Sequence, residues 1–239
     1  MAKLVMWIMR LISKLLYGLG YRAKPDYKLI SYSQEGEDLV LRRFLKDETE
    51  PGFYVDIGAH HPERFSNTAY YSKLGWRGIN IDADPNLIDQ FIASRPNDIN
   101  LALGVGLDEA AMVFHIFNEK ALNTFDENLA AERSKVPHYY VEAKRKVAIL
   151  PLAKILKDYL PKGQKISFMS VDVEGKDLEV LKSNDWSQYR PDYIITECLE
   201  ARRLLEIGAD PVVKYLTKQG YEPIAKTLYS IFFQDVSND

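Results

Sequence analysis

Short apolar runs alternate with segments of helical periodicity along the chain from Ser33 onward. The apolar runs have the length of buried strands, and they predict strands at 53–57, 78–81, 99–103, 112–117, 166–171 and 193–196. The periodic segments predict helices at 35–46, 67–74, 87–93, 151–160 and 211–219. Two last runs, 222–227 and 229–233, suit an antiparallel hairpin at the sheet edge. This alternation indicates an α/β domain whose sheet is mainly parallel.

The start of the chain differs from the rest. Its apolar side chains recur at helical spacing, and its basic side chains gather on the opposite side. The apolar set is Leu4, Ile8, Leu11, Ile12, Leu15 and Leu19, and the basic set is Lys3, Arg10 and Lys14. Basic residues interrupt the apolar stretch, which argues against a signal peptide and against a spanning helix. This pattern predicts an amphipathic helix in residues 1–24. Residues 1–21 would either lie on a membrane surface or pack on the domain or on a second subunit.

The remainder, residues 25–239, is interpreted as one domain, because its length suits a single α/β unit and no internal repeat is visible. Residues 118–146 are rich in charged residues and tyrosine. We interpret this stretch as an insertion or lid and not as part of the core.

Charge and cysteine content narrow the choice of partner and compartment. The net charge is −3 and the sequence pI is near 5.9, which gives no electrostatic case for nucleic acid as a partner. Cys198 is the only cysteine, so an internal disulfide is excluded and a reducing setting is expected. One cysteine and four histidines also exclude a conventional structural zinc site. We expect a cytoplasmic protein, peripheral on the inner face of the membrane if the first segment binds lipid.

Acidic side chains collect at the carboxyl ends of the predicted strands. Asp56, Asp82, Asp172, Glu174 and Glu197 each stand at or just after a strand. Ligands of open α/β sheets bind beyond those strand ends, and buried charges need partners. The recurrence of carboxylates at one edge therefore predicts a shared ligand cleft.

The loop after the first strand reads Gly-Ala-His-His-Pro at 58–62. Gly58 and Ala59 let the backbone approach a ligand, and Asp56 can accept hydrogen bonds from loop amides or an ammonium group. The G-x-G-x-x-G spacing of a dinucleotide site is missing, which favours a ligand without a pyrophosphate. Asp82 follows the second strand, where a carboxylate can bind both hydroxyls of a ribose. The competing interpretation is that Asp56 caps a turn and Asp82 is an ordinary loop carboxylate.

Several longer motifs resemble the signatures of one known family. They are Tyr32-Ser-Gln-Glu-Gly-Glu-Asp38, Val55-Asp-Ile-Gly-Ala59, Gly75-Trp-Arg-Gly-Ile-Asn-Ile-Asp82, Leu122-Asn-Thr-Phe-Asp126, Ser170-Val-Asp-Val-Glu-Gly175 and Arg190-Pro-Asp-Tyr-Ile-Ile-Thr-Glu197. In this order and spacing the chain resembles the FkbM-type methyltransferases from about residue 31 to residue 197. The departure lies in His60-His61-Pro62, where many relatives carry Asn and a second glycine.

The resemblance implies a class I methyltransferase fold, a Rossmann-like and mostly parallel seven-stranded sheet with an antiparallel C-terminal hairpin and helices on both faces. It implies S-adenosylmethionine as the cofactor and methyl transfer, usually to a hydroxyl of a sugar or natural product. The implied cofactor-binding residues are Asp56, Gly58, Ala59, His60, Asp82, Ala83, Ala102, Leu103 and Asp172. Asp82 matches the ribose carboxylate, and Ala102 and Leu103 would flank the adenine.

Transfer to a sugar hydroxyl needs a base or a metal ion, because the hydroxyl is a poor nucleophile until its proton is removed. Asp172 is the first candidate, with Glu174 and Glu197 in support, and His60 or His61 is an alternative base. A divalent metal, if the reaction uses one, would be held by Asp172 and Glu197. The alternatives are that the carboxylates cap the following helix and that the histidines only pack the loop.

Three functions from different classes follow from these observations. The first is a methyltransferase that modifies a hydroxyl of a sugar, glycolipid or natural-product acceptor. The second is an NAD(P)-dependent oxidoreductase on a similar sheet, against which the missing glycine pattern argues. The third is a scaffold that keeps the methyltransferase fold without turnover, against which the complete set of acidic residues argues.

Overall fold

The computed structural model describes residues 27–45, 51–198 and 203–237. Contacts divide the chain into two units, Met1–Ile30 and Ser31–Asp239, and every element described below belongs to the second. The amphipathic helix expected at 1–24 lies outside the described residues and stays a prediction. Within the described ranges, no helix has the length and apolar character needed to cross a membrane.

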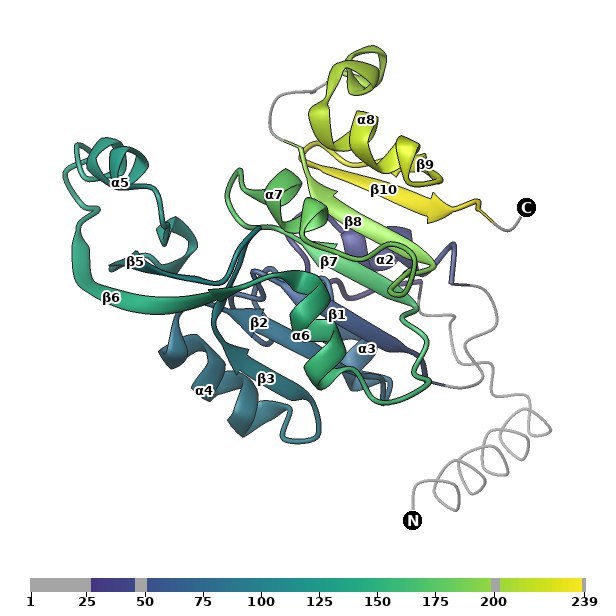
Figure 1. The fold of residues 1–239 in the computed structure, drawn as a ribbon, viewed down its shortest axis with the longest axis horizontal. Helices are drawn as coiled ribbons and strands as arrows, with labels where there is room; N and C mark the ends of the chain where they lie inside the picture. Colours follow the sequence, from purple (N-terminus) through teal and green to yellow (C-terminus); the bar gives the residue numbers. More distant parts are fainter. Residues whose placement is uncertain (1–26, 46–50, 199–202, 238–239) are drawn as a thin grey trace, which may run out of the picture. The chain divides into compact units, whose positions relative to one another are not determined.

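A seven-stranded sheet forms the centre of the second unit (Figure 1). Its strands are β1 (Phe53–Ile57), β2 (Arg77–Asp82), β3 (Ile99–Ala102), β7 (Phe168–Val171), β8 (Tyr193–Glu197), β9 (Tyr221–Lys226) and β10 (Ser230–Asp235). Their order is β3-β2-β1-β7-β8-β10-β9. The neighbours from β3 to β8 pair in parallel, whereas β10 pairs antiparallel with both β8 and β9. The predicted mostly parallel sheet with an antiparallel C-terminal hairpin is confirmed.

The central strand β1 shows how the apolar sequence makes this sheet. All five of its residues are buried, because parallel strands flank it and helices cover both of its faces. Val55 and Ile57 point into the larger core on one face, and Tyr54 points into a smaller core on the other. Asp56 lies opposite Asn80 of β2 and Ser170 of β7. The face away from the larger core therefore carries a row of polar residues across three strands.

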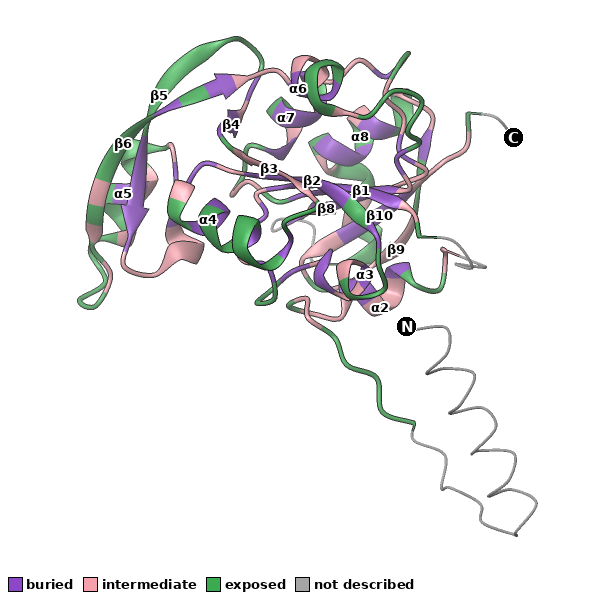
Figure 2. Cartoon of the chain, turned by 90° about the horizontal axis from the view of Figure 1, so that it is seen from below, coloured by how far each residue is buried: buried purple, intermediate pink, exposed green. Residues whose placement is uncertain are grey.

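Helices cover both faces of the sheet (Figure 2). On one face lie α6 (Leu152–Tyr159), α7 (Asp177–Lys182) and α8 (Pro211–Lys218), and on the other α2 (Glu37–Leu41), α3 (Ala69–Lys73) and α4 (Pro85–Ser94). The buried residues of α6 are Leu152, Ile155 and Leu156, which share one helical face and join the larger core. Asp84 caps α4 by accepting the amide of Asn86. The expectation of helices on both faces is confirmed.

A second, three-stranded sheet follows β3, with the order β4-β6-β5. Its strands are β4 (Gly104–Val105), β5 (Ala110–Phe117) and β6 (Val141–Leu150), and the β5–β6 connection contains η1 (Lys120–Leu122) and α5 (Glu127–Arg133). The extra strand predicted at 112–117 is confirmed as β5. The insertion predicted at 118–146 contains η1 and α5, and its last residues, 141–146, belong to β6 and pair antiparallel with β5. Exposed charged residues in β6 hide the strand pattern in the sequence.

The helix predicted at 35–46 is shorter than expected. It begins only after Gly36, whose φ of 86° is left-handed, and α2 ends at Leu41. The preceding turn is tied to the buried carboxylate of Asp38, which accepts from the hydroxyls of Ser31 and Ser33. One further short helix, η2 (Leu204–Ala209), precedes α8. The polar groups before α2 are therefore held in a fixed turn by the carboxylate of Asp38.

Candidate active site

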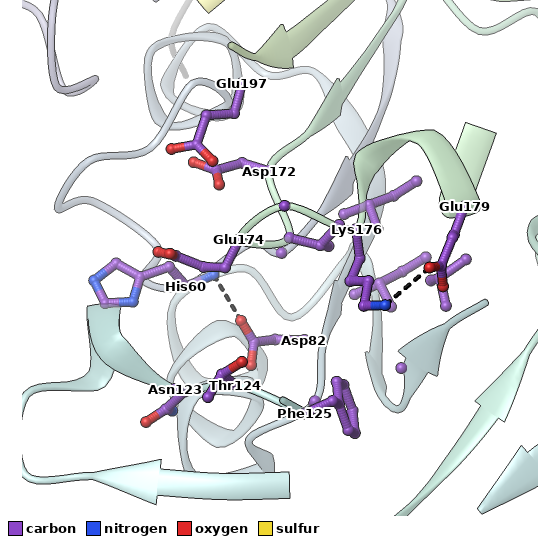
Figure 3. A pocket seen from close by; sticks show the side chains of 18 of the residues that line it. His60, Asp82, Asn123, Thr124, Phe125, Asp172, Glu174, Lys176, Glu179 and Glu197 are labelled. Atoms are coloured by element: carbon purple, nitrogen blue, oxygen red, sulfur yellow. Dashed lines mark hydrogen bonds and ion pairs between the residues drawn. The ribbon is translucent and has the colours of Figure 1, made fainter. Parts of the chain in front are cut away.

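A cavity of about 980 Å³ lies at the carboxyl ends of the parallel strands (Figure 3). The chain order reverses between β1 and β7, the position where open α/β sheets bind ligands. The lining includes eight of the predicted site residues, namely Gly58, His60, Asp82, Ala83, Leu103, Asp172, Glu174 and Glu197. The structure therefore brings most of the predicted site into one cavity.

Three predicted cofactor residues, Asp56, Ala59 and Ala102, do not line this cavity, and their assignment is corrected. Asp56 lies between Val55 and Ile57 on β1, so it faces the opposite side of the sheet. There its carboxylate accepts the hydroxyl of Thr68 at 2.6 Å, and burial raises its pKa. Asp56 thus bonds the loop that follows β1 and is not part of the cavity lining. Ala59 is buried against α4, and Ala102 is exposed outside the cavity.

Gly58 brings the loops after β1 and β7 into contact. Its φ is 78°, and its amide donates to the carbonyl of Ile81 at 2.9 Å. A Cβ at this position would lie 1.7 Å from the carbonyl oxygen of Asp172. Only glycine therefore fits, both for backbone conformation and for space.

His60 lines the cavity in a strained backbone conformation, with a φ of 54°. Its amide donates to Asp82 Oδ2 at 2.9 Å, and its ring lies parallel to that of Phe65. Burial, together with the charge of Arg64, lowers the pKa of His60 to about 4. The imidazole is neutral at physiological pH and too weak to serve as an efficient general base there.

His61 has a local role in the same loop. Its Nδ1 accepts the amides of Glu63 and Arg64, each at 3.0 Å. It is absent from the cavity lining. The loop-packing interpretation therefore holds for His61.

Asp82 is placed for recognition of a diol. Its Oδ2 accepts the amide of His60, and its Oδ1 accepts the amide of Asp84 at 2.8 Å. These two bonds fix the carboxylate, and each oxygen has a further lone pair for a ligand hydroxyl. Burial raises the pKa of Asp82 to about 7. The carboxylate, as an acceptor for two hydroxyls, therefore fits the ribose of a nucleoside.

An apolar wall continues from Asp82 toward the second sheet. Ala83, Leu103 and Phe125 line it, and the ring of Phe125 contacts Phe114 at a centroid distance of 4.5 Å. A Cβ on Gly104 would lie 2.8 Å from Phe125 Cζ, so glycine keeps this wall close to the strand end. An apolar wall beside a diol-binding carboxylate suits adenosine.

Two carboxylates from neighbouring strands face each other across the cavity. Figure 3 shows the side chains of Asp172, after β7, and Glu197, at the end of β8, pointing toward one another. Solvent reaches Asp172 through the cavity, but the surrounding walls raise its pKa well above the usual range, and the charge of Glu197 raises it further. Burial raises the pKa of Glu197 to about 7, and the charges of Glu174 and Asp177 add to this shift. The pair therefore holds a proton that can be released near neutral pH.

Glu174 connects this pair to helix α5, in the connection between β5 and β6. Its φ is 54°, and its carboxylate pairs with Arg133 of α5 at 2.5 Å. Arg133 also donates to the carbonyl of Leu122 at 2.8 Å. The first residue of α7 is Asp177, and its N-cap Lys176 makes no side-chain capping bond. The arrangement favours a role for Asp172 and Glu174 in the cavity over a role in capping that helix.

The metal expectation receives no support from geometry. Among the described residues, no group of three or more His, Cys, Asp or Glu side chains is arranged to hold a metal ion. Asp172 and Glu197 stand together as two carboxylates without a third such ligand.

The turn before α2 and the first residue of α2 supply lining residues that the site prediction left out. Glu35 and Glu37 line the cavity next to Tyr229 and Ser230. The Glu35 carboxylate accepts the amide of Tyr229 at 2.9 Å, and Glu37 accepts the hydroxyl of Ser230 at 3.0 Å. The signal was the acidic motif 32–38, which the sequence shows well before the first strand.

Asn123 and Thr124 are a second omission, and they come from the Leu122–Asp126 motif. Asn123 accepts the amide of Phe117 at 2.8 Å, and Thr124 forms a bridge with His115 of β5. These contacts seat the motif against the second sheet, on the side of the cavity that holds Asp82 (Figure 3).

The sheet order, the carboxylate at the end of β2 and the cavity at the reversal point define a class I methyltransferase fold. The sequence family described as Methyltransferase FkbM domain matches residues 56–223, which is more than half of the chain. The chain belongs to this family and is a methyltransferase. Family and fold imply use of S-adenosylmethionine.

Solved structures similar to this chain include two methyltransferases. One is precorrin-6y C5,15-methyltransferase from Geobacter metallireducens GS-15, with 13% identity, a TM-score of 0.43, and coverage of 88% of this chain and 94% of that one. The other is the METTL16 MTase domain, with 12% identity, a TM-score of 0.40, and coverage of 81% of this chain and 63% of that one. No curated protein matches the chain.

Asp82→Asn is expected to weaken S-adenosylmethionine binding by about tenfold or more, because one charged acceptor for the ribose hydroxyls is lost. Isothermal calorimetry measures this change. Asp89→Asn serves as the control. Asp89 is an exposed residue of α4, the helix that follows β2, and its substitution should leave the affinity unchanged. Equal affinities for wild type and Asp82→Asn would contradict the ribose assignment.

Proposed function

We propose that this protein transfers the methyl group of S-adenosylmethionine to a hydroxyl of a sugar, on a glycan, glycolipid or natural product. The observation that carries the proposal is the pair of carboxylates, Asp172 and Glu197, facing the same cavity as Asp82. One carboxylate binds the ribose and the pair takes the acceptor proton. Sugar hydroxyls are well matched to a wall of carboxylates, which accept hydrogen bonds from them.

The cofactor, when bound, supplies a methyl group on a sulfonium, which is intrinsically reactive. The protein's main task is alignment, and correct positioning can contribute about 7–11 kcal/mol to lowering the barrier. Asp82 would fix the ribose of the cofactor, and the wall formed by Leu103 and Phe125 would hold its adenine. The strained backbone at His60 and Glu174 brings the loops after β1 and β7 to the same end of the cavity.

Asp172 is the base in this account. It would take the proton of the acceptor hydroxyl as that oxygen bonds to the methyl group, which S-adenosylmethionine, held by Asp82 and the apolar wall, would supply. Burial raises the pKa of Asp172 well above its usual range and the charge of Glu197 raises it as well, which makes Asp172 a stronger base than an ordinary carboxylate. His60, whose pKa is lowered to about 4, shapes the pocket and does not act as the base.

An oxidoreductase is the second candidate class and is less well supported. The loop at 58–62 has a single glycine, and the bulky residues after it oppose a pyrophosphate. A scaffold without turnover is disfavoured because the carboxylate pair and Asp82 still meet in one cavity.

A lipid-linked acceptor is part of the proposal, and its support is the amphipathic pattern of residues 1–21. Co-sedimentation with anionic liposomes tests it. The full chain is expected to pellet with the vesicles, and a chain lacking residues 1–24 is expected to stay in the supernatant. Equal pelleting of both would remove the membrane from the proposal.

The chemistry is tested by incubating the protein with methyl-labelled S-adenosylmethionine and a glycan or glycolipid extract. Acid hydrolysis should then release a labelled O-methyl sugar, and the Asp172→Asn variant should form it at least about 10²-fold more slowly. Label found only in protein, nucleic acid or an N-methyl product would overturn the proposed acceptor.

The rate of methyl transfer is expected to rise with pH above the ordinary carboxyl range, because Asp172, whose pKa is raised well above its usual value by burial, must lose its proton before it can act as a base. In Glu197→Gln one negative neighbour is gone, so the pKa of Asp172 falls and the acidic limb moves to lower pH. A pH–rate profile measures the acidic limb in the wild type and in Glu197→Gln. An unchanged limb in Glu197→Gln would show that the two carboxylates are not coupled.

A further inference from the structure

Arg95 follows α4, is only 6% exposed, and has no part in the chemistry proposed above. Its guanidinium reaches the loop that joins β1 to α3. Nη2 donates to the carbonyl of Pro62 and to the hydroxyl of Ser66, and Nη1 donates to the hydroxyl of Thr68 at 2.9 Å. One rigid, planar group therefore contacts the loop at three points.

On the other side, the same guanidinium is held by the sheet. Nη1 donates to the hydroxyl of Tyr54 on β1 and to the side-chain oxygen of Asn80 on β2, each at 3.3 Å. The Tyr54 hydroxyl in turn donates to Asp98 at 2.5 Å. These strands set the position of Arg95 independently of the loop.

Two carboxylates balance the charge of Arg95, each through one hydroxyl. Asp98 lies behind Tyr54, on the sheet side. Asp56 lies behind Thr68, on the loop side, where Thr68 donates to it at 2.6 Å. A connected network of this kind fixes its members more strongly than separate bonds do. The network also explains why Asp56 is buried outside the cavity, because its carboxylate holds the Thr68 hydroxyl that Arg95 contacts.

The loop that Arg95 holds is strained. His60 and Phe65 both have left-handed backbone angles, with φ values of 54° and 55°, although neither is glycine. Both side chains line the cavity, and their rings lie parallel. Strained residues persist only where the surroundings determine their conformation. The bond from Arg95 to Pro62 falls between His60 and Phe65, and the bond to Ser66 follows Phe65 directly.

We propose that Arg95 is a positioning residue for the cofactor site: it clamps the loop 58–68 to the sheet and thereby sets His60 and Phe65 against the bound cofactor. The inference rests on the proposed function, because it takes this cavity to be the S-adenosylmethionine site. It assigns no direct contact between Arg95 and any ligand.

A purely structural arginine would have a different effect. Losing any of its bonds would then lower stability and leave the cofactor affinity unchanged. Two substitutions distinguish a positioning role from a purely structural one. Thr68→Val removes the hydroxyl that links Arg95 to Asp56 on the loop side. Tyr54→Phe removes the hydroxyl that links Arg95 to Asp98 on the sheet side.

The test measures S-adenosylmethionine affinity by calorimetry and unfolding by denaturant for the full chain and for Arg95→Lys, Thr68→Val and Tyr54→Phe. Arg95→Lys keeps the charge but loses the planar fork, and it is expected to raise the Kd about tenfold or more, since small displacements in a site have large effects. Thr68→Val should raise the Kd in the same direction. Tyr54→Phe should lower stability and leave the Kd within about twofold of wild type.

Each result separates the inference from the proposed function. A wild-type chain that binds no S-adenosylmethionine rejects the cofactor assignment itself. A wild type that binds normally, with Arg95→Lys and Thr68→Val at the wild-type Kd, rejects the role of Arg95 alone. If Arg95→Lys fails to fold, the comparison of Thr68→Val with Tyr54→Phe decides, and equal Kd values for the two overturn the inference.

Discussion

Asp172→Asn is expected to lower kcat by about 10²–10⁴-fold, the usual contribution of a positioned general base. The amide has nearly the shape of the carboxylate but accepts no proton from the acceptor hydroxyl. S-adenosylmethionine affinity should stay close to wild type, because Asp82 and the apolar wall provide the nucleoside contacts. Steady-state kinetics and calorimetry on the same preparation measure the two effects separately.

Glu179→Gln is the matched control for this substitution. Glu179 lines the same cavity but is paired with Lys176 at 2.8 Å, apart from the carboxylate pair (Figure 3). It is expected to keep kcat close to wild type, since exposed ion pairs contribute little. A wild-type kcat in Asp172→Asn would remove Asp172 as the base, and an equal loss in both variants would point to a general effect of charge.

Gly58→Ala is expected to destabilise the protein by more than about 4 kcal/mol, which is exceptional for a single methyl group. The added Cβ would lie 1.7 Å from the carbonyl oxygen of Asp172, a rigid backbone atom that cannot swing aside. The loops after β1 and β7 must then separate, and cofactor binding should be lost with them. Denaturant unfolding gives the stability change.

Gly163→Ala separates the clash from the backbone strain. Gly163 has a φ of 76°, close to that of Gly58, but a Cβ there meets nothing within 4 Å. Only the left-handed conformation is penalised, at roughly 1–2 kcal/mol. If the two variants lost the same stability, the close approach of the loops would not be what Gly58 protects.

The central sheet could be predicted from the sequence because its strands are short apolar runs bounded by loops. Phe53–Ile57 is the clearest case, since burial on both faces favours an apolar strand and Asp56 is its one charged residue. The carboxylates at the strand ends followed from the same reasoning, because the fold carries them to one edge. Asp82, Asp172 and Glu197 meet there as expected.

The second sheet was harder to predict because β6 does not look like a buried strand. Residues 144–146 are three consecutive basic residues, all exposed, and only Val147 and Ile149 are buried. A strand with one solvent-exposed face at the edge of the domain carries a weak alternation that charges obscure. The pairing with β5 is a tertiary contact, and the sequence of β6 alone does not specify it.

Asp56 shows a different limit. Its place at the end of β1 was predicted, but the face on which it lies depends on which neighbours of β1 form the larger core. The role of Arg95 was invisible for a similar reason. It is distant in sequence from Pro62 and Thr68, and only the packing of α4 brings it to them.

The most direct test of the account is a calorimetric titration of the full chain with S-adenosylmethionine and, separately, with NAD. The account predicts saturable binding of S-adenosylmethionine at one site per chain, weakened in Asp82→Asn, and no binding of NAD. Binding of NAD without binding of S-adenosylmethionine would contradict it.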